Sequence, residues 1–375
     1  MTGSVPAFLC ENQTLHTQST FRLLVVRLGA MGDILHALPA ITALRLAHPQ
    51  WHIAWVVDPR WQPLLSAFNY QSNSAPSGRS PAQPLVDRLH LASTRQWKRR
   101  PGTPKTFRQI RTLARELRAA HYEAVIDLQG AIRSAIIGRM ASSPRLIGEA
   151  KPREWPASWL FSERIFTRRP HVVEQDVELA SAIAGDALSP VEPLLPVDPA
   201  AECWCDALLA SSSAAAAKPI ALIAPGAGWG AKRWPPERYA AVARGLADRG
   251  FHVFVNSAPG EESLSATVAA HGAAALLAAS LPQLIALTRR IALLIGGDTG
   301  PLHLASALGR PVVGIYGPTD PGRNGPYSAR TRVLRSPASR RDHSRRAAPD
   351  PGLLTITPDN VLAAAAELLA EEQVR

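Results

Sequence analysis

The most chemically suggestive part of the sequence is LLIGGDTGPLHLASALGRPVVGIYGPTDPG, residues 293–322. An apolar run ends in two glycines, and Asp298, Thr299 and Gly300 follow it, with His303 one turn further on. Free backbone N–H groups at the start of a helix, together with the helix dipole, attract an anion. The segment therefore predicts a phosphate site, although an Asp or Thr N-cap of an ordinary helix explains the same residue types.

A second glycine-rich loop, PGAGWGAKRWPPERY, follows another apolar run. Gly226 and Gly228 let the backbone approach a ligand, and Lys232 and Arg233 follow at once. Backbone N–H groups combined with side-chain cations suit a pyrophosphate, and a basic loop in solvent is the alternative. The loop also matches the dinucleotide pattern G-x-G-x-x-A, but weakly, because two prolines delay the next helix.

Two acids stand near the starts of predicted helices. In RLGAMGDILHALPA, Asp33 follows a glycine turn and is a candidate general base. The alternative is an acid favoured by the helix dipole. Glu261 comes just after SAPG and could bind a ribose hydroxyl, or could equally be an acid in a helix's first turn. His36 is assigned to packing. No Ser-His-Asp order, Asp-x-Asp pair or His/Cys cluster indicates a nucleophilic or metal site.

Length and composition predict a globular protein of two domains. The chain has 375 residues, of which 46% are hydrophobic and 19% charged. No apolar run reaches the ~18 residues that a membrane span needs. The first residues lack the charged and apolar regions of a secretory signal, so we expect a tail over residues 1–20. Three cysteines cannot form a disulfide framework and are interpreted as thiols in a reducing cytosol.

The net charge of +11 is concentrated in two segments. Residues 95–118 carry nine Lys and Arg against one Glu, and residues 335–346 carry five Arg against one Asp. Such segments imply an anionic partner: nucleic acid, anionic lipid or a phosphorylated substrate. Nucleic acid is the disfavoured partner, because the chain has no helix-turn-helix, zinc or RNA-module signature and its basic runs lack interleaved aromatics.

The first basic segment includes a predicted amphipathic helix, TFRQIRTLARELRAAH. Its apolar face consists of Phe107, Ile110, Leu113 and Leu117, which we expect to be buried. The arginines between them are then free to face solvent or a ligand. A solvated helix face is the alternative to an anion-binding surface.

Strands alternate with helices along the chain, which predicts parallel sheets covered on both faces. We expect a Pro/Ser-rich mobile loop at 69–84 and a proline-rich linker at 185–202. The expected organisation is a tail (1–20), an α/β domain (21–184), the linker (185–202), a second α/β domain (203–357) and a C-terminal helix (358–375) that could pack back on the first domain. Expected strands lie within 22–28, 51–58, 122–130, 219–230, 251–260, 274–280, 291–300 and 311–320.

Three stretches together resemble the bacterial lipopolysaccharide heptosyltransferases, family 9 of the glycosyltransferases: RLGAMGDILHALPAITALR, GAKRWPPERY and GGDTGPLHLASALGRPVVGIYGPTDPG. The resemblance extends from Arg22 to the final helix. The first and third stretches, with IDLQGAIRSA, REWPASWLF and HVVEQ, look most like heptosyltransferase I, whereas GAGWGAKRWP looks more like heptosyltransferase II. The resemblance implies the GT-B fold, in which two Rossmann-like α/β domains with parallel sheets face a central cleft.

The resemblance also implies a reaction. It is the inverting transfer of L-glycero-D-manno-heptose from ADP-heptose to 3-deoxy-D-manno-octulosonic acid (Kdo) on lipid A, without a metal or other cofactor. Asp33 would deprotonate the acceptor hydroxyl, Lys232 would neutralise the leaving pyrophosphate, and Glu261 would meet the adenosine ribose. The donor-binding set implied as a whole is Gly226, Gly228, Lys232, Glu261, Asp298, Thr299, Gly300 and His303.

On the acceptor side, we expect Arg108, Arg111 and Arg115 of the basic helix, and Arg153 in REWPASWLF, to bind the acceptor. Phosphates on lipid A would place a monomeric cytoplasmic enzyme at the inner face of the inner membrane. Two alternatives remain: a heptosyltransferase II-type transfer to a heptose acceptor, and a non-catalytic nucleotide-sugar-binding protein.

Overall fold

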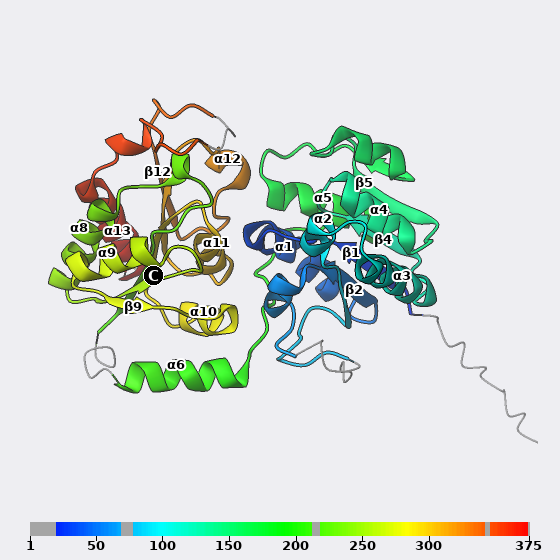
Figure 1. The fold of residues 1–375 in the computed structure, drawn as a ribbon, viewed down its shortest axis with the longest axis horizontal. Coiled ribbons are helices and arrows are strands. Elements are labelled where there is room, and N and C mark those ends of the chain that lie inside the picture. The colour runs from blue at the N-terminus through cyan, green and yellow to red at the C-terminus, as the bar shows by residue number, and fades with distance from the viewer. Residues whose placement is uncertain (1–19, 69–77, 212–217, 342–345, 374–375) are drawn as a thin grey trace, which may run out of the picture.

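The structure is a computed structural model that describes residues 20–68, 78–211, 218–341 and 346–373. It contains two α/β domains side by side, each built on a six-stranded sheet in which the paired strands are parallel. Figure 1 shows the two domains with helices α1 (Met31–Ala47) and α11 (Gly300–Ala307) lying between their sheets. The expected fold class, two Rossmann-like domains in the GT-B arrangement, is confirmed.

The first sheet has the strand order β3-β2-β1-β4-β5-β6. The order reverses between β1 and β4, and ligands of such sheets bind beyond the carboxyl ends of the strands at this switch point. The strands are β1 (Arg22–Val26), β2 (His52–Val57), β3 (Arg88–Leu91), β4 (Ala124–Asp127), β5 (Arg145–Glu149) and β6 (Glu163–Ile165). The helices besides α1 are η1 (Pro59–Leu64), α2 (Thr94–Arg99), α3 (Pro104–Ala119), α4 (Ile132–Met140), η2 (Trp155–Leu160) and α5 (Val172–Ala184).

The second sheet has the strand order β12-β11-β10-β7-β8-β9. Counted from β7 and read from the β9 end, this is the same order as in the first sheet. Its switch point lies between β7 and β10. The strands are β7 (Ile220–Ala224), β8 (His252–Asn256), β9 (Ala275–Leu277), β10 (Leu293–Gly297), β11 (Val312–Tyr316) and β12 (Thr331–Arg335). The other elements are α6 (Pro199–Ser211), η3 (Gly230–Lys232), α8 (Pro236–Asp248), α9 (Glu262–Gly272), α10 (Leu281–Thr288), α12 (Pro321–Asn324), η4 (Leu353–Thr355) and α13 (Pro358–Gln373).

The apolar core forms three layers. The outer layer of the first domain packs α3 and α4 on its sheet, and the outer layer of the second packs α8 and α13 on the other sheet. The middle layer is continuous between the domains: it contains Leu38 and Ile41 of α1, Val177 of α5, and Leu302 and Leu304 of α11. Burying one shared layer fixes the ends of the two sheets relative to each other.

Helices α1 and α11 approach closely because each presents a glycine to the other. A Cβ at Gly32 would lie 2.9 Å from Cδ2 of His303, and a Cβ at Gly300 would overlap the side chain of Met31. Contacts of this kind require a residue without a side chain. The N-terminal turns of both helices are thereby brought together at the mouth between the sheets.

The chain crosses between the domains along residues 186–198, after Gly185 caps the end of α5 with φ of 77°. Helix α6 then packs on α10, along the second domain (Figure 1). Helix α13 packs on α8, β11 and β12 rather than back on the first domain, which corrects that expectation. The reason is its apolar face, where Val361, Ala365 and Leu368 are buried in the second domain's outer layer.

All eight expected strands are present, but four strands were not foreseen: β3, β5, β6 and β12. Three of them are sheet edges, and they are short runs with polar residues, such as RLHL and ERI. Within the described residues, no helix combines the length and apolar character needed to cross a membrane.

Candidate functional site

A cavity of about 660 Å³ opens between the two domains, at the carboxyl ends of the central strands. Residues from α1 and from the loops after β7, β8, β10 and β11 line it. The cavity brings together all the sequence-predicted donor-site residues, the candidate base and one candidate acceptor residue: Gly226, Gly228, Lys232, Glu261, Asp298, Thr299, Gly300, His303, Asp33 and Arg153.

Asp33 lies in the first turn of α1, and its carboxylate is held on two sides. Oδ2 accepts a hydrogen bond of 2.9 Å from the backbone N–H of Ala30, and Oδ1 lies 3.5 Å from Nη2 of Arg27. Arg27 is buried and also donates through Nε to the backbone carbonyl of Asp33, at 3.1 Å. The Asp33 side chain keeps 41% of its surface exposed, so its orientation is fixed while the carboxylate remains open to a ligand.

Two buried carboxyl groups lie in the electrostatic surroundings of Arg27. Burial raises the pKa of Asp127 to about 6, and its Oδ1 accepts hydrogen bonds from two backbone N–H groups and from Ser134. Burial raises the pKa of Asp176 to about 7, and the charge of Asp33 adds to the shift. Among the described residues, Oδ2 of Asp176 has no hydrogen-bond partner. The sequence reasoning singled out neither Arg27 nor these two acids.

On the other side of the cavity, Lys232 and Asp298 form an ion pair in which Nζ donates to Oδ2. The same ammonium lies 4.1 Å from the ring centroid of Trp229, a cation–π geometry. Oδ1 of Asp298 is 3.0 Å from Nε2 of His303. Burial alone would raise the pKa of Asp298, but His303 and Lys232 hold it well below its usual range. The site therefore keeps a fixed carboxylate and a cation at the start of α11.

The glycine loop after β7 packs against Glu261. A Cβ at Gly226 would overlap the Glu261 carboxylate, which is hydrogen-bonded to the backbone of Ala227. Burial raises the pKa of Glu261. Two further polar groups in the wall, Oδ1 of Asn256 and Oγ1 of Thr319, are buried without a hydrogen-bond partner among the described residues. Buried polar atoms without partners are costly, and a bound ligand with hydroxyl or amide donors would satisfy them.

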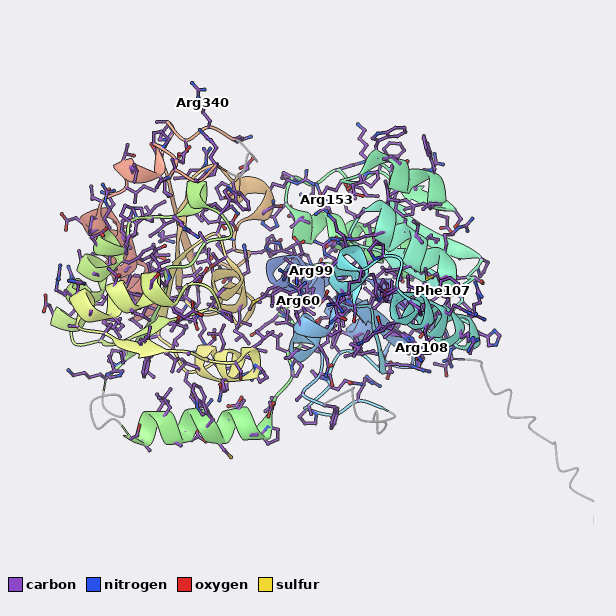
Figure 2. The ribbon with its side chains drawn as sticks, in the orientation of Figure 1. Arg60, Arg99, Phe107, Arg108, Arg153 and Arg340 are labelled. Carbon is purple, nitrogen blue, oxygen red and sulfur yellow. The ribbon has the colours of Figure 1, made fainter. Side chains whose placement is uncertain are left out.

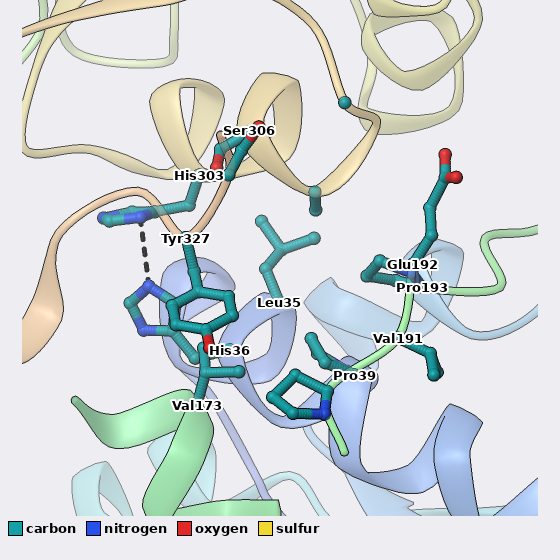
Figure 3. A pocket seen from close by; sticks show the side chains of 14 residues that line it. Leu35, His36, Pro39, Val173, Val191, Glu192, Pro193, His303, Ser306 and Tyr327 are labelled. Carbon is teal, nitrogen blue, oxygen red and sulfur yellow. Dashed lines mark hydrogen bonds between the residues drawn. The ribbon is translucent and has the colours of Figure 1, made fainter. Parts of the chain in front are cut away.

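Three histidines connect the domains beside the cavity. Nε2 of His36 lies 3.1 Å from Nδ1 of His303, the bond drawn in Figure 3, and 3.2 Å from the carbonyl oxygen of Gly325. Nε2 of His171 reaches the same carbonyl at 3.1 Å, while its Nδ1 accepts from the backbone N–H of Val173. Burial lowers the pKa of His36 well below 6.5 and lowers that of His171. Neutral rings of His36 and His171 that carry the proton on Nε2 satisfy these contacts, with Nδ1 of His303 accepting from His36.

These contacts form a continuous chain from His36 through His303 and Asp298 to Lys232. The sequence reasoning assigned His36 to packing, although it follows Asp33 by three residues and therefore shares a helix face with it. Behind the chain lies a second cavity of about 280 Å³, lined by apolar residues such as Leu35 and Pro39 and by polar ones such as Glu192 and Ser306 (Figure 3). His36 and His303 line both cavities and so form the wall between them.

The structure does not bring the other three candidate acceptor residues into the cavity. Arg108, Arg111 and Arg115 are exposed on α3, and Figure 2 shows Arg108 on the part of the first domain away from the second domain. The expectation that Phe107 is buried is wrong, because its side chain is 64% exposed. The buried residues of α3 are Thr106, Leu113 and Leu117, a face that turns Phe107 outward.

The second basic segment is tied to its own domain where the structure describes it. Nε of Arg335 donates to the carbonyl of Gly317 at 3.1 Å, and Nη1 of Arg341 lies 3.0 Å from Oδ2 of Asp320. Residues 342–345 lie outside the described residues, as do 69–77 of the predicted mobile loop and 1–19 of the predicted tail. Within the described residues, no group of three or more His, Cys, Asp or Glu side chains is arranged to hold a metal ion.

Comparison with known proteins gives one consistent similarity. The family described as "Glycosyltransferase family 9 (heptosyltransferase)" matches residues 110–350. Lipopolysaccharide heptosyltransferase 1 of Escherichia coli K12 is 28% identical over 323 residues, which cover 84% of this chain and 94% of that protein. Lipopolysaccharide heptosyltransferase 2 of Salmonella typhimurium is 28% identical over 372 residues, which cover 94% of this chain and 100% of that protein.

Solved structures agree. The E. coli heptosyltransferase WaaC with ADP is 25% identical, has a TM-score of 0.73, and aligns over 93% of this chain and 100% of its own. The same enzyme with ADP-2-deoxy-2-fluoro heptose has a TM-score of 0.72 at 25% identity, and the alignment covers 92% and 99% of the two chains.

Proposed function

The chain belongs to glycosyltransferase family 9, the heptosyltransferases, and from this we propose that it transfers L-glycero-D-manno-heptose from ADP-heptose to Kdo of Kdo-lipid A. Its relatives named lipopolysaccharide heptosyltransferase support a role in core synthesis. The WaaC structures with ADP and with a fluorinated ADP-heptose support the donor. The observation that carries the proposal is the single cavity that Asp33 of one domain shares with Lys232 and Asp298 of the other.

The second domain binds the donor in this proposal. Backbone N–H groups of the loop with Gly226 and Gly228, and of the start of α11, face the diphosphate. Lys232 adds a positive charge, which Asp298 and the ring of Trp229 hold in place. Stabilising the negative charge that develops on the leaving ADP lowers the barrier to transfer. Glu261 accepts hydrogen bonds from the adenosine ribose.

The first domain supplies the acceptor and the base. The acceptor hydroxyl oxygen attacks the anomeric carbon of heptose from the face opposite the diphosphate, so that carbon inverts. As the new C–O bond forms, the bond between the anomeric carbon and the phosphate oxygen breaks, and ADP leaves with the electron pair. Asp33 takes the hydroxyl proton, in the usual manner of a positioned carboxylate base. We propose that no metal or other cofactor takes part, since Lys232 and the backbone N–H groups supply the positive charge.

Arg153, the one acceptor candidate in the cavity wall, binds an anionic group of the acceptor. We place the protein, as a monomer, at the cytoplasmic face of the inner membrane. There the arginines of α3 meet anionic lipid, and nucleic acid is not a partner. Two other functions remain to be tested: transfer to a heptose acceptor, favoured by the full-length similarity to heptosyltransferase 2, and binding of a nucleotide sugar without transfer.

One experiment separates these functions. Purified protein is mixed with ADP-heptose and either Kdo-lipid A or the same acceptor already carrying one heptose, and ADP release and product mass are followed. We expect ADP release and a heptose mass increment with Kdo-lipid A. Product formed only from the heptosylated acceptor would assign the second function. Donor binding by calorimetry without product from either acceptor would assign the third.

A further inference from the structure

Two tryptophans stand on the surface of the first domain. Trp155 and Trp159 of η2 form an edge-to-face pair with ring centroids 4.6 Å apart, yet their side chains remain 64% and 66% exposed. Large exposed apolar side chains that gather in one place indicate an interaction site. Tryptophan combines an apolar body with a polar N–H and is enriched where membrane proteins meet the lipid headgroups.

Helix α4 extends this apolar surface. Elements α4 and η2 pack on each other, and Glu154 joins them by accepting a hydrogen bond of 2.9 Å from the backbone N–H of Ile132. The backbone N–H of Glu154 in turn donates to the carbonyl of Gly130 at 2.8 Å. Ile132 and Ile136, one helical turn apart on α4, are 39% and 45% exposed. We call the surface formed by Ile132, Ile136, Trp155 and Trp159 the tryptophan face.

The elements that carry the tryptophan face also carry exposed cations. Arg133 and Arg139 of α4 are exposed, as are Lys151 and Arg153 in the turn before η2. Glu154, the acid in this stretch, caps the start of α4 through Oε2, and its Oε1 lies 3.6 Å from Nη2 of Arg153. Apolar side chains surrounded by Lys and Arg match the chemistry of an anionic bilayer surface, in which headgroup charges lie above the acyl chains. A partner protein would need acidic residues placed opposite these cations, whereas an anionic bilayer presents negative phosphates over its whole surface.

The face lies close along the chain to a residue of the candidate site. Arg153, labelled in Figure 2, lines the cavity between the domains. It precedes Trp155 by two residues. An acceptor whose lipid tail stays in the bilayer must present its sugar to Asp33 while the enzyme rests on the membrane. Contact through η2 and α4 would hold the Arg153 side of the cavity against that surface.

We propose that the tryptophan face is the surface through which this protein docks on an anionic lipid bilayer, with Trp155 and Trp159 inserted among the headgroups. The relevance of this docking to turnover rests on the proposed transfer to a lipid-linked acceptor. Binding to the bilayer does not itself depend on that transfer. The exposed arginines of α3 then act as a second, purely electrostatic contact.

The test measures sedimentation of the whole protein with vesicles of phosphatidylethanolamine and phosphatidylglycerol, and with phosphatidylcholine vesicles as the uncharged comparison. The variants are Trp155→Ala with Trp159→Ala, and Arg133→Gln with Arg139→Gln. The matched control is Leu276→Ala with Leu354→Ala, which removes two exposed apolar side chains of the second domain. Circular dichroism and ADP binding establish that each variant is folded.

We expect the tryptophan variant to bind anionic vesicles at least about tenfold more weakly, because each ring would bury a large apolar area in the interface. The arginine variant should lose the preference for anionic over uncharged vesicles, and the control should match the wild type. Unchanged vesicle binding in the tryptophan variant would overturn the proposal. So would sedimentation velocity showing a dimer that the tryptophan variant breaks, since the face would then bind a second copy.

Vesicle binding requires no turnover, so docking without heptose transfer would contradict only the proposed function. Where transfer is observed, the tryptophan variant should be slow with an acceptor embedded in vesicles. It should be close to wild type with a water-soluble acceptor that lacks the acyl chains.

Discussion

The His36 imidazole of the first domain and the His303 imidazole of the second share a hydrogen bond, with Nε2 3.1 Å from Nδ1. Through His303 this bond continues to Asp298 and on to Lys232. His36 is thus a positioning residue for the proposed donor site: its effect on Lys232 passes through two other side chains. Separation of the domains would break the chain at its first bond.

We expect His36→Phe, which keeps a planar ring but cannot make this bond, to lower kcat about tenfold, the order of one buried hydrogen bond. The KM for ADP-heptose should change less. His36→Gln places an N–H donor near the position of Nε2 and should restore most of the rate. His171→Phe is the matched control, because His171 contacts the same Gly325 carbonyl without joining the chain. Equal losses in His36→Phe and His171→Phe would reduce the role of His36 to domain contact.

Asp33→Asn should leave ADP binding within a few-fold of wild type and lower turnover by ~10²–10⁴, the usual contribution of a general base. The asparagine oxygen can still accept from the N–H of Ala30, so the start of α1 should remain intact. Steady-state rates and calorimetry with ADP measure the two quantities. Turnover near the wild-type value would leave Asp33 as an acid that only stabilises the helix start.

Lys232→Ala should weaken ADP binding and lower the rate together, each by about tenfold or more, because a cation on the diphosphate acts in both the ground and the transition state. Arg249→Ala removes an exposed cation of the same domain that does not line the cavity, and serves as the control. Treatment with EDTA should leave the wild-type rate unchanged. Loss of activity in EDTA that added divalent metal restores would contradict the proposed metal-independent transfer.

Changing Arg108, Arg111 and Arg115 to Gln should raise the KM for a vesicle-bound acceptor and leave the donor KM unchanged. Each cation near an anionic surface contributes about 1 kcal/mol, and salt screens that contribution within a Debye length. The difference from wild type should therefore shrink as the ionic strength rises. An unchanged acceptor KM at low salt would assign these side chains to an ordinary solvated helix face.

Asp176→Asn should stabilise the fold in a pH-dependent way. A folded-state pKa of about 7, raised from 3.8 by burial, means that ionising this carboxyl opposes folding as the pH rises. The variant's gain in unfolding free energy should grow by about 1.4 kcal/mol per pH unit between those two values and then level off. Below about pH 4 the gain should disappear, because both states carry the proton. Chemical denaturation at pH 4, 6 and 8 measures it, and a gain that does not vary with pH would contradict the assignment.

The sequence predicts the sheet centres and the donor loops because both are signalled locally. Strands β1, β7 and β10 are β-branched or leucine-rich runs. Strand β10 ends in two glycines, and a glycine follows β1 and β7 within three residues. Asp298 comes directly after β10, and Lys232 lies in the glycine-rich loop after β7. Edge strands such as β3 and β6 carry no such signal, since only part of their surface is buried. Those strands form because a neighbouring strand offers free backbone groups.

Contacts between distant segments are what the sequence could not show. His36 and His303 are 267 residues apart, and the roles of Arg27 and Asp176 depend on how α5 packs on α1. For Phe107 the sequence predicts a buried contact that the structure does not contain. Its spacing fits the apolar stripe of α3, but the helix contacts the sheet through a face set by Leu113 and Leu117, and Phe107 lies outside it.

The reciprocal glycine contacts of α1 and α11 constrain how the two halves can be recombined. Gly32 fits His303, and Gly300 fits Met31, so each half carries one small and one large member of a matched pair. A chimaera can join the first half of one relative to the second half of another. In such a chimaera the two members of each pair come from different parents. Exchange of acceptor and donor specificity by splicing along residues 186–198 therefore depends on matching positions 31, 32, 300 and 303 as well as the substrate contacts.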